Sequence, residues 1–196
     1  EFRLWTFLQE DSTIGTLTSK VIDTREIDDI PGYVLEQKLS LDFSKVGPAP
    51  KLEVTGEHYV SYEGAYLGDD LEITSGEQTG RIELEREGEV IVGEASQGER
   101  RDDVEVAFAP GGFSLDHYMF DQYELYFAAR GLAVGDTFHD TVFVPRDMST
   151  STIRAEVVDW SWVQLYKGVF DSVFTVRLSQ PAPMELFINA NLMLRK

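Results

Sequence analysis

Residues 33–43 read YVLEQKLSLDF, and the alternation of apolar and polar side chains in this stretch decides the fold class. Successive side chains of a β-strand point to opposite faces, so a period of two predicts a strand with one buried and one solvated face. The same alternation occurs earlier, in residues 2–9 (FRLWTFLQ), and later, in residues 81–86 (RIELER). The pattern predicts an all-β protein with antiparallel strands.

The rest of the chain extends this pattern on both sides. Turns rich in Gly, Pro and Asp separate most of the apolar runs. The Asp28-Asp29 and Asp69-Asp70 pairs are predicted to lie in such turns. No linker divides the sequence, so it predicts a single β-rich domain over residues 1–196. The further strands are expected at residues 13–23, 51–54, 58–62, 65–67, 71–74, 89–94, 104–109, 136–144, 150–159, 162–166, 169–179 and 184–194.

Residues 114–130, SLDHYMFDQYELYFAAR, break the β pattern because apolar residues recur there at helical spacing. Ser114 suits the N-cap position, and Asp116 suits the positive end of the helix dipole. Arg130 suits the negative end, and Gly131 suits the left-handed position after the helix. The sequence therefore predicts one amphipathic helix, at about residues 114–130, packed on a bent sheet, half-barrel or open barrel.

The composition excludes several classes of function. The 196 residues include 35 Asp and Glu against 17 Lys and Arg, a net charge of −18. This charge argues against nucleic-acid binding and against direct docking on an anionic membrane, both of which need clustered Lys and Arg. The absence of Cys excludes disulfides, thiolate metal sites and a cysteine nucleophile.

No motif predicts catalysis, a cofactor or a metal site. The three histidines, His58, His117 and His139, stand apart in the sequence, and the acidic residues are spread along it. No nucleophile elbow, P-loop or dinucleotide-binding motif occurs. The alternative is a hydrolase whose site is assembled from scattered carboxylates and His139.

The aromatic residues are the more informative candidates for binding. Trp160, Trp162 and Tyr166 have the same parity, so a strand would place them on one face. One interpretation is an ordinary core, and the other is an apolar cavity inside a curved sheet that holds a lipophilic ligand. The candidate ligand-binding residues are Tyr118, Phe138, Trp160, Trp162 and Tyr166.

The layout resembles an uncharacterised family of bacterial envelope domains that is itself distantly similar to lipoprotein-carrier half-barrels. This resemblance implies a strongly bent antiparallel sheet wrapped partly around a helix, and a location outside the cytoplasm. The residues that carry it are Ile14-Gly15, Phe113-Ser114-Leu115-Asp116, the aromatic helix, the block 131–138 (GLAVGDTF), and the stretches 157–169 and 187–196.

The leading hypothesis is therefore a non-enzymatic envelope, periplasmic or secreted protein that binds an apolar ligand or a protein partner. An alternative is a structural or assembly module of a cell-surface complex, in which an edge strand accepts a strand of a neighbour. The chain begins at Glu1-Phe2 without Met, as expected after removal of a leader or from a cloning scar. The oligomeric state is left open.

Overall fold

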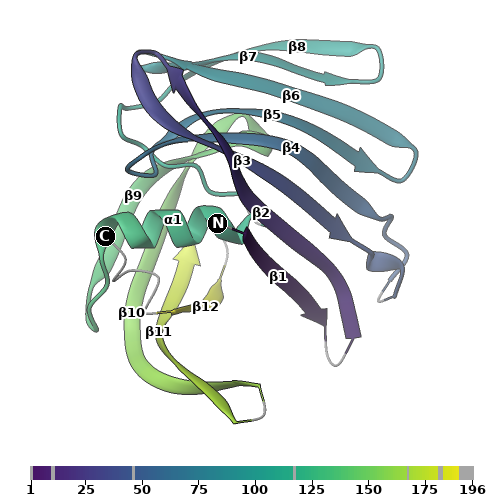
Figure 1. Cartoon of the computed structure of the whole chain (residues 1–196). Helices are drawn as coiled ribbons and strands as arrows, with labels where there is room; N and C mark the ends of the chain where they lie inside the picture. The colour runs from purple at the N-terminus through teal and green to yellow at the C-terminus, as the bar shows by residue number, and fades with distance from the viewer. Residues whose placement is uncertain are drawn as a thin grey trace. The chain divides into compact units, whose positions relative to one another are not determined.

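The structure, a computed structural model, describes residues 2–9, 12–45, 47–116, 118–166, 168–180 and 183–189. Within these residues it contains twelve strands, one α-helix and two short 3-10 helices, and both sheets are antiparallel (Figure 1). The prediction of an all-β antiparallel fold with one helix is confirmed. In the part of the chain that is described, neither sheet closes into a barrel.

The first sheet is an eight-stranded meander in which each strand pairs with its neighbours in sequence, so its edges are the first and last strands. The 3-10 helix η1 (Phe43–Lys45) follows the third strand. The strands are β1 (Phe2–Gln9), β2 (Ser12–Ile27), β3 (Ile30–Leu41), β4 (Leu52–Ser61), β5 (Tyr66–Ser75), β6 (Gln78–Glu87), β7 (Val90–Gln97) and β8 (Arg100–Ala107).

The second sheet has four strands in the order β12-β11-β10-β9. The helix α1 (Phe120–Arg130) precedes it, and the 3-10 helix η2 (Pro145–Asp147) follows its first strand. Its strands are β9 (Thr137–Val144), β10 (Ser149–Tyr166), β11 (Val169–Gln180) and β12 (Met184–Asn189).

The chain forms two compact units. Unit 1 comprises Glu1–Gln122 and Phe143–Ser149 and holds the eight-stranded sheet. Unit 2 comprises Tyr123–Val142 and Thr150–Lys196 and holds most of the four-stranded sheet. The boundaries fall within α1, within β9 and after the first residue of β10. No helix among the described residues has the length and apolarity needed to cross a membrane.

Glycines allow the sheet of unit 1 to curve as Figure 1 shows. A Cβ atom at Gly56 of β4 would lie 2.0 Å from the carbonyl oxygen of Asp70, and one at Gly93 of β7 would lie 1.9 Å from that of Glu83. Both glycines have φ near +150°, which L-residues rarely adopt (152° and 153°). The absence of a side chain therefore permits close approach of the neighbouring strands at these two positions.

Several strands are longer than the sequence predicts. The separate strands expected at residues 51–54 and 58–62 form the single strand β4, which runs through Gly56. The strands expected at 65–67 and 71–74 likewise form β5. The prediction that Asp69-Asp70 lies in a turn is wrong, because both residues pair within β5. The Asp28-Asp29 turn is confirmed, with φ of 52° and 59°.

The helix is confirmed, but it begins at Phe120 rather than near Ser114. Ser114 does not cap it. Instead, residues 113–115 run beside the end of β9, where Phe143 N donates to Phe113 O at 2.9 Å and Leu115 N donates to Phe143 O at 2.8 Å. These bonds hold the backbone extended where helical spacing predicted a first turn. The predicted end is correct, since Gly131 is left-handed with φ of 71°.

The core of unit 1 covers the inner face of its sheet. On β6, Ile82, Leu84 and Arg86 are buried and alternate with exposed residues. Phe143 packs over this face, with its ring centroid 5.1 Å from that of Tyr66. A second cluster joins Leu17, Leu39, Leu41, Val54, Leu71 and Met119.

The core of unit 2 combines α1 with β9. The Arg130 guanidinium lies 4.0 Å from the ring centroid of Tyr126, and its Nη2 is 2.9 Å from Asp140 Oδ2. The Tyr126 hydroxyl donates to the same carboxylate at 2.5 Å. Burial and this hydrogen bond raise the pKa of Tyr126 well above its ordinary value. The last turn of the helix is thus attached to the strand that follows it.

The Gly56→Ala substitution tests the role of glycine in the bend. We expect it to lower the free energy of unfolding by about 1–3 kcal/mol, because the added methyl group overlaps the Asp70 carbonyl. Chemical denaturation followed by circular dichroism measures the change. Gly47→Ala is the matched control, since a Cβ there meets no atom within 4 Å. Equal stability of the two variants would refute this explanation.

Candidate functional site

The aromatic residues predicted to bind a ligand are divided between the two units. In unit 1, the ring centroid of Tyr118 lies 6.2 Å from those of Phe7 and Phe43. In unit 2, the Phe138 ring packs edge-on against Tyr126 and Phe127, at 6.1 and 5.4 Å. Both rings therefore form part of aromatic clusters within their own units.

Trp160 and Trp162 lie together on β10, with ring centroids 6.3 Å apart. They are 45% and 63% exposed, and they share a face of the strand as their parity predicts. Tyr166 is the last residue of β10, and its side chain lies outside the described part of the structure. The two tryptophans thus form an exposed aromatic pair on unit 2.

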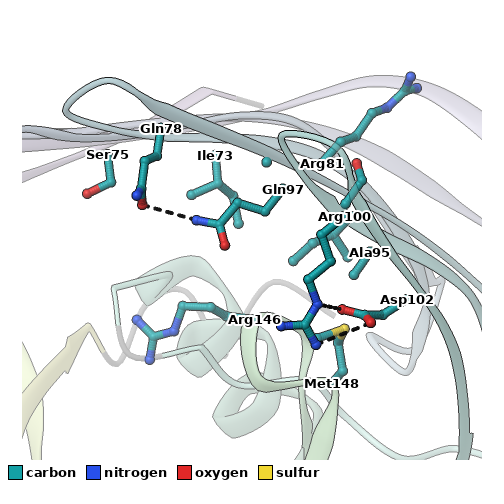
Figure 2. A pocket seen from close by; sticks show the side chains of 13 residues that line it. Ile73, Ser75, Gln78, Arg81, Ala95, Gln97, Arg100, Asp102, Arg146 and Met148 are labelled. Carbon is teal, nitrogen blue, oxygen red and sulfur yellow. Dashed lines mark hydrogen bonds and ion pairs between the residues drawn. The ribbon is translucent and has the colours of Figure 1, made fainter.

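The largest well-defined cavity among those we describe lies on the inner face of the sheet of unit 1, and sequence analysis did not identify its residues. It has a volume of about 400 Å³, within the range typical of small-molecule sites (Figure 2). Ile73, Ile82 and Ala95 form its apolar wall on the sheet side. Met148, which follows η2, faces them across the cavity.

Polar side chains lie along the same cavity. Gln97 Nε2 donates to Gln78 Oε1 at 3.1 Å, which joins the ends of β6 and β7. Arg100 Nε lies 2.8 Å from Asp102 Oδ2, so this guanidinium already has a close carboxylate partner (Figure 2). Arg81 points away from the cavity, toward the carboxylates of the outer face.

Arg146 of η2 is the most loosely paired cation of the cavity. Its guanidinium is 3.8 Å from Asp116 Oδ1 and 3.6 Å from Asp147 Oδ1, distances too long for hydrogen bonds. It has no closer hydrogen-bond partner in the described ranges. The side chain is 43% exposed, so its N–H groups are accessible to a ligand.

A smaller cavity of about 30 Å³ adjoins the first, because Ile73, Ile82 and Arg146 contribute to both. Its remaining lining is mostly apolar and includes Tyr118. Among the predicted binding residues whose side chains the structure describes, Tyr118 is thus the one that lines one of these cavities. Together the two cavities offer an apolar surface that has a guanidinium at one side.

A chain of buried polar side chains crosses the same sheet. His58 Nδ1 lies 2.7 Å from Asp69 Oδ1, and the Tyr66 hydroxyl donates to Asp69 Oδ2 at 2.8 Å. His58 Nε2 is 3.4 Å from the Ser114 hydroxyl oxygen. His58 and Asp69 are each 1% exposed, and Ser114 is 4% exposed. The register of β4 and β5 places His58 directly opposite Asp69.

Burial favours neutral His58 and lowers its pKa, but Asp69 and Asp121 together outweigh this effect. The charge of Asp69, its hydrogen bond to the ring and the charge of Asp121 raise the pKa of His58 above its ordinary value of 6.5. The Asp121 carboxylate also accepts a hydrogen bond from Gln37 Nε2. The imidazolium form of His58 therefore compensates buried negative charge.

Ser114, His58 and Asp69 follow the order of a hydrolase triad, but the geometry favours a structural role. The Ser114–His58 contact of 3.4 Å is long, and none of the three side chains lines a cavity described above. Leu115 N, the next backbone donor after Ser114, is bonded to Phe143 O. We interpret the chain as a buried hydrogen-bond network that fixes residues 113–116 on the sheet.

His139, the histidine of the hydrolase hypothesis, is exposed on β9. Among the described residues it has no hydrogen bond or ion pair. His117, the other histidine noted in the sequence, lies outside them. No group of three or more His, Asp or Glu side chains in the described ranges is arranged to hold a metal ion.

Comparison of the chain with models of known protein families, with curated proteins and with solved structures gives no match.

Replacement of His58 tests its electrostatic role. His58→Gln removes a cation from beside two buried carboxylates, and we expect it to lower the unfolding free energy by about 3 kcal/mol at about pH 6. Because the folded-state pKa is raised, the stabilisation is complete below about pH 6.5 and declines as the pH rises through the folded-state pKa.

Urea unfolding of both proteins at several pH values between about 6 and 9 measures this difference. His139→Gln is the control, because His139 is exposed. A stability difference between wild type and His58→Gln that does not vary with pH would contradict the assignment.

Proposed function

We propose that the protein is a non-enzymatic binding protein for a small amphipathic carboxylate. The observation that carries this proposal is the 400 Å³ cavity, which combines an apolar wall with the loosely paired guanidinium of Arg146. An apolar chain would lie against Ile73 and Ile82 and reach the smaller cavity beside them. A carboxylate head would accept two hydrogen bonds from the planar guanidinium.

The polar side chains of the cavity favour a ligand with a polar head over a purely apolar one. Gln78 and Gln97 bond to each other, so each keeps further amide donors and acceptors for a ligand. A wholly apolar ligand would cover these groups without replacing their contacts with water, at a cost in free energy. Arg146 adds the preference for a negative charge.

A location in the bacterial envelope or outside the cell is part of the proposal. It is supported by the resemblance of the sequence to envelope domains and fits a protein that carries or senses a lipid-derived acid. A protein partner, an assembly role and a hydrolase activity at His139 stay predictions.

Binding of decanoate and decan-1-ol to the full chain tests the proposal. We expect decanoate to bind with 1:1 stoichiometry in native mass spectrometry and calorimetry. Arg146→Met removes a charge-assisted contact and should weaken decanoate binding by about tenfold, while decan-1-ol binding changes little. Gln97→Trp places a large ring in the cavity and should weaken both ligands.

Arg101→Met is the control for the loss of charge. Arg101 neighbours Arg100 on β8 and is exposed, and it pairs with Glu94 rather than lining the cavity. Decanoate that does not bind, or that binds wild type and Arg146→Met equally, would exclude this function for the cavity.

A further inference from the structure

Arg86 is a buried cation that the proposed carboxylate site does not use. It is 2% exposed and lies at one end of the inner row of β6, whereas Gln78 and Ile82 of the carboxylate cavity lie toward the other end. Its guanidinium stacks near Phe108, 5.8 Å from the ring centroid. Burial of a charged group is unfavourable unless other groups compensate it, so the Arg86 guanidinium needs compensating contacts.

Three backbone carbonyls receive the hydrogen bonds of Arg86. Nε donates to Gly88 O at 3.0 Å, and Nη1 and Nη2 donate to Tyr66 O and Phe108 O, each at 3.2 Å. A guanidinium has five N–H groups. The other two N–H groups of Arg86 have no partner among the residues that the structure describes. Three neutral carbonyls thus satisfy part of its bonding capacity and none of its charge.

No carboxylate within the described ranges lies within 4.0 Å of this guanidinium. Asp28 attracts this charge from farther away, and its Oδ2 accepts a hydrogen bond from Gly88 N at 2.8 Å. Burial lowers the pKa of Arg86, and the attraction of Asp28 only partly opposes this. The positive charge therefore lacks a close counter-ion.

A cavity of about 380 Å³ opens beside Arg86. Ile30, Pro31 and Leu67 give it an apolar wall, and Ser61 adds a hydroxyl group. Tyr62 also lines it, and this exposed ring lies 4.7 Å from that of Tyr33. Its volume, its apolar wall and the Tyr62 ring suit a small aromatic body that carries one anionic group.

Glu63 is the acidic side chain that lines this cavity. It is exposed, so solvent screens its repulsion of an anion, whereas Arg86 acts from a buried position. The balance between the two charges favours an anion at Arg86 and leaves a modest repulsion that a substitution can remove.

We propose that Arg86 and this cavity form a second binding site of unit 1, which takes a small organic carboxylate with a flat apolar or aromatic body. The two N–H groups of Arg86 that donate to none of the three carbonyls bind the carboxylate oxygens. Pro31, Leu67 and Tyr62 contact the body of the ligand. This site does not depend on the decanoate site, because the cavities share no lining residue.

Calorimetric titration of the full chain with benzoate and with its neutral analogue benzamide tests this proposal. We expect benzoate to bind with a dissociation constant below about 1 mM and benzamide to bind at least about tenfold more weakly. Replacement of Arg86 removes three backbone contacts and is expected to impair folding, so two other substitutions carry the test.

Ala65→Leu fills the cavity without touching the hydrogen bonds of Arg86, and we expect it to weaken benzoate binding by about tenfold. Glu63→Gln removes the repelling charge and should strengthen benzoate binding about twofold without affecting benzamide. Glu87→Gln, the control, changes an exposed residue on the outer face of β6 and should alter neither ligand.

Arg146→Met should also leave benzoate binding unchanged, which separates this site from the decanoate site. Benzoate that does not bind, that binds no better than benzamide, or that binds Ala65→Leu as it binds wild type would overturn the proposal. Thermal unfolding of each variant, followed by circular dichroism, verifies that a loss of binding is not a loss of fold.

Discussion

The inner face of the eight-stranded sheet must be covered by segments of the chain that lie outside that sheet. A meander buries only one face, and it has no second sheet of its own to pack against. In unit 1 the described part of the cover consists of two segments far apart in sequence, one of residues 113–116 and 118–122 and one of residues 143–149. The backbone bonds of Phe143 to Phe113 and Leu115 join these two segments. The hydrophobic core and the two adjoining cavities lined by Arg146 depend on this cover.

The cover is attached to the sheet by polar contacts as well as apolar ones. His58 joins Asp69 of the next strand to Ser114 of the cover. A buried network of this kind is costly unless each member finds a partner, so it fixes one position of the segment on the sheet. An apolar contact would allow the segment to slide. Together with the backbone bonds of Phe143, this constraint keeps residues 113–115 extended although their sequence suits a helix start.

The sequence predicts the class of fold well because alternation is a local signal. Residues 33–43 and 81–86 fall within β3 and β6, and α1 ends where Gly131 suggested. Local signals failed where the deciding contact is distant. Gly56 and Asp69-Asp70 have turn chemistry, yet the close packing of adjacent strands places them inside β4 and β5.

The site was harder to predict than the fold for the same reason. His58 stands alone in the sequence, and only the register of β4 on β5 brings it opposite Asp69. Its parity with Val54 and Val60, both buried, was the one available signal that it faces inward. Arg86 gave a similar signal, since it alternates with exposed acidic residues in phase with Ile82 and Leu84. A charged residue in phase with buried apolar neighbours along a strand is therefore a sequence signal of a buried polar site.

The net charge of −18 does not show where the acidic and the basic side chains lie. The acidic side chains of β6, such as Glu83 and Glu85, lie on its exposed face, whereas Arg86 is buried on the inner face. Arg146 lines a cavity of the same unit, with a side chain that is 43% exposed. A strongly acidic protein repels anions at long range, but a buried or half-buried guanidinium acts at short range in a medium of lower dielectric constant. The acidic exterior and the arginine-lined interior are therefore compatible with selection of small carboxylates, which diffuse as single charges, over polyanions such as nucleic acids.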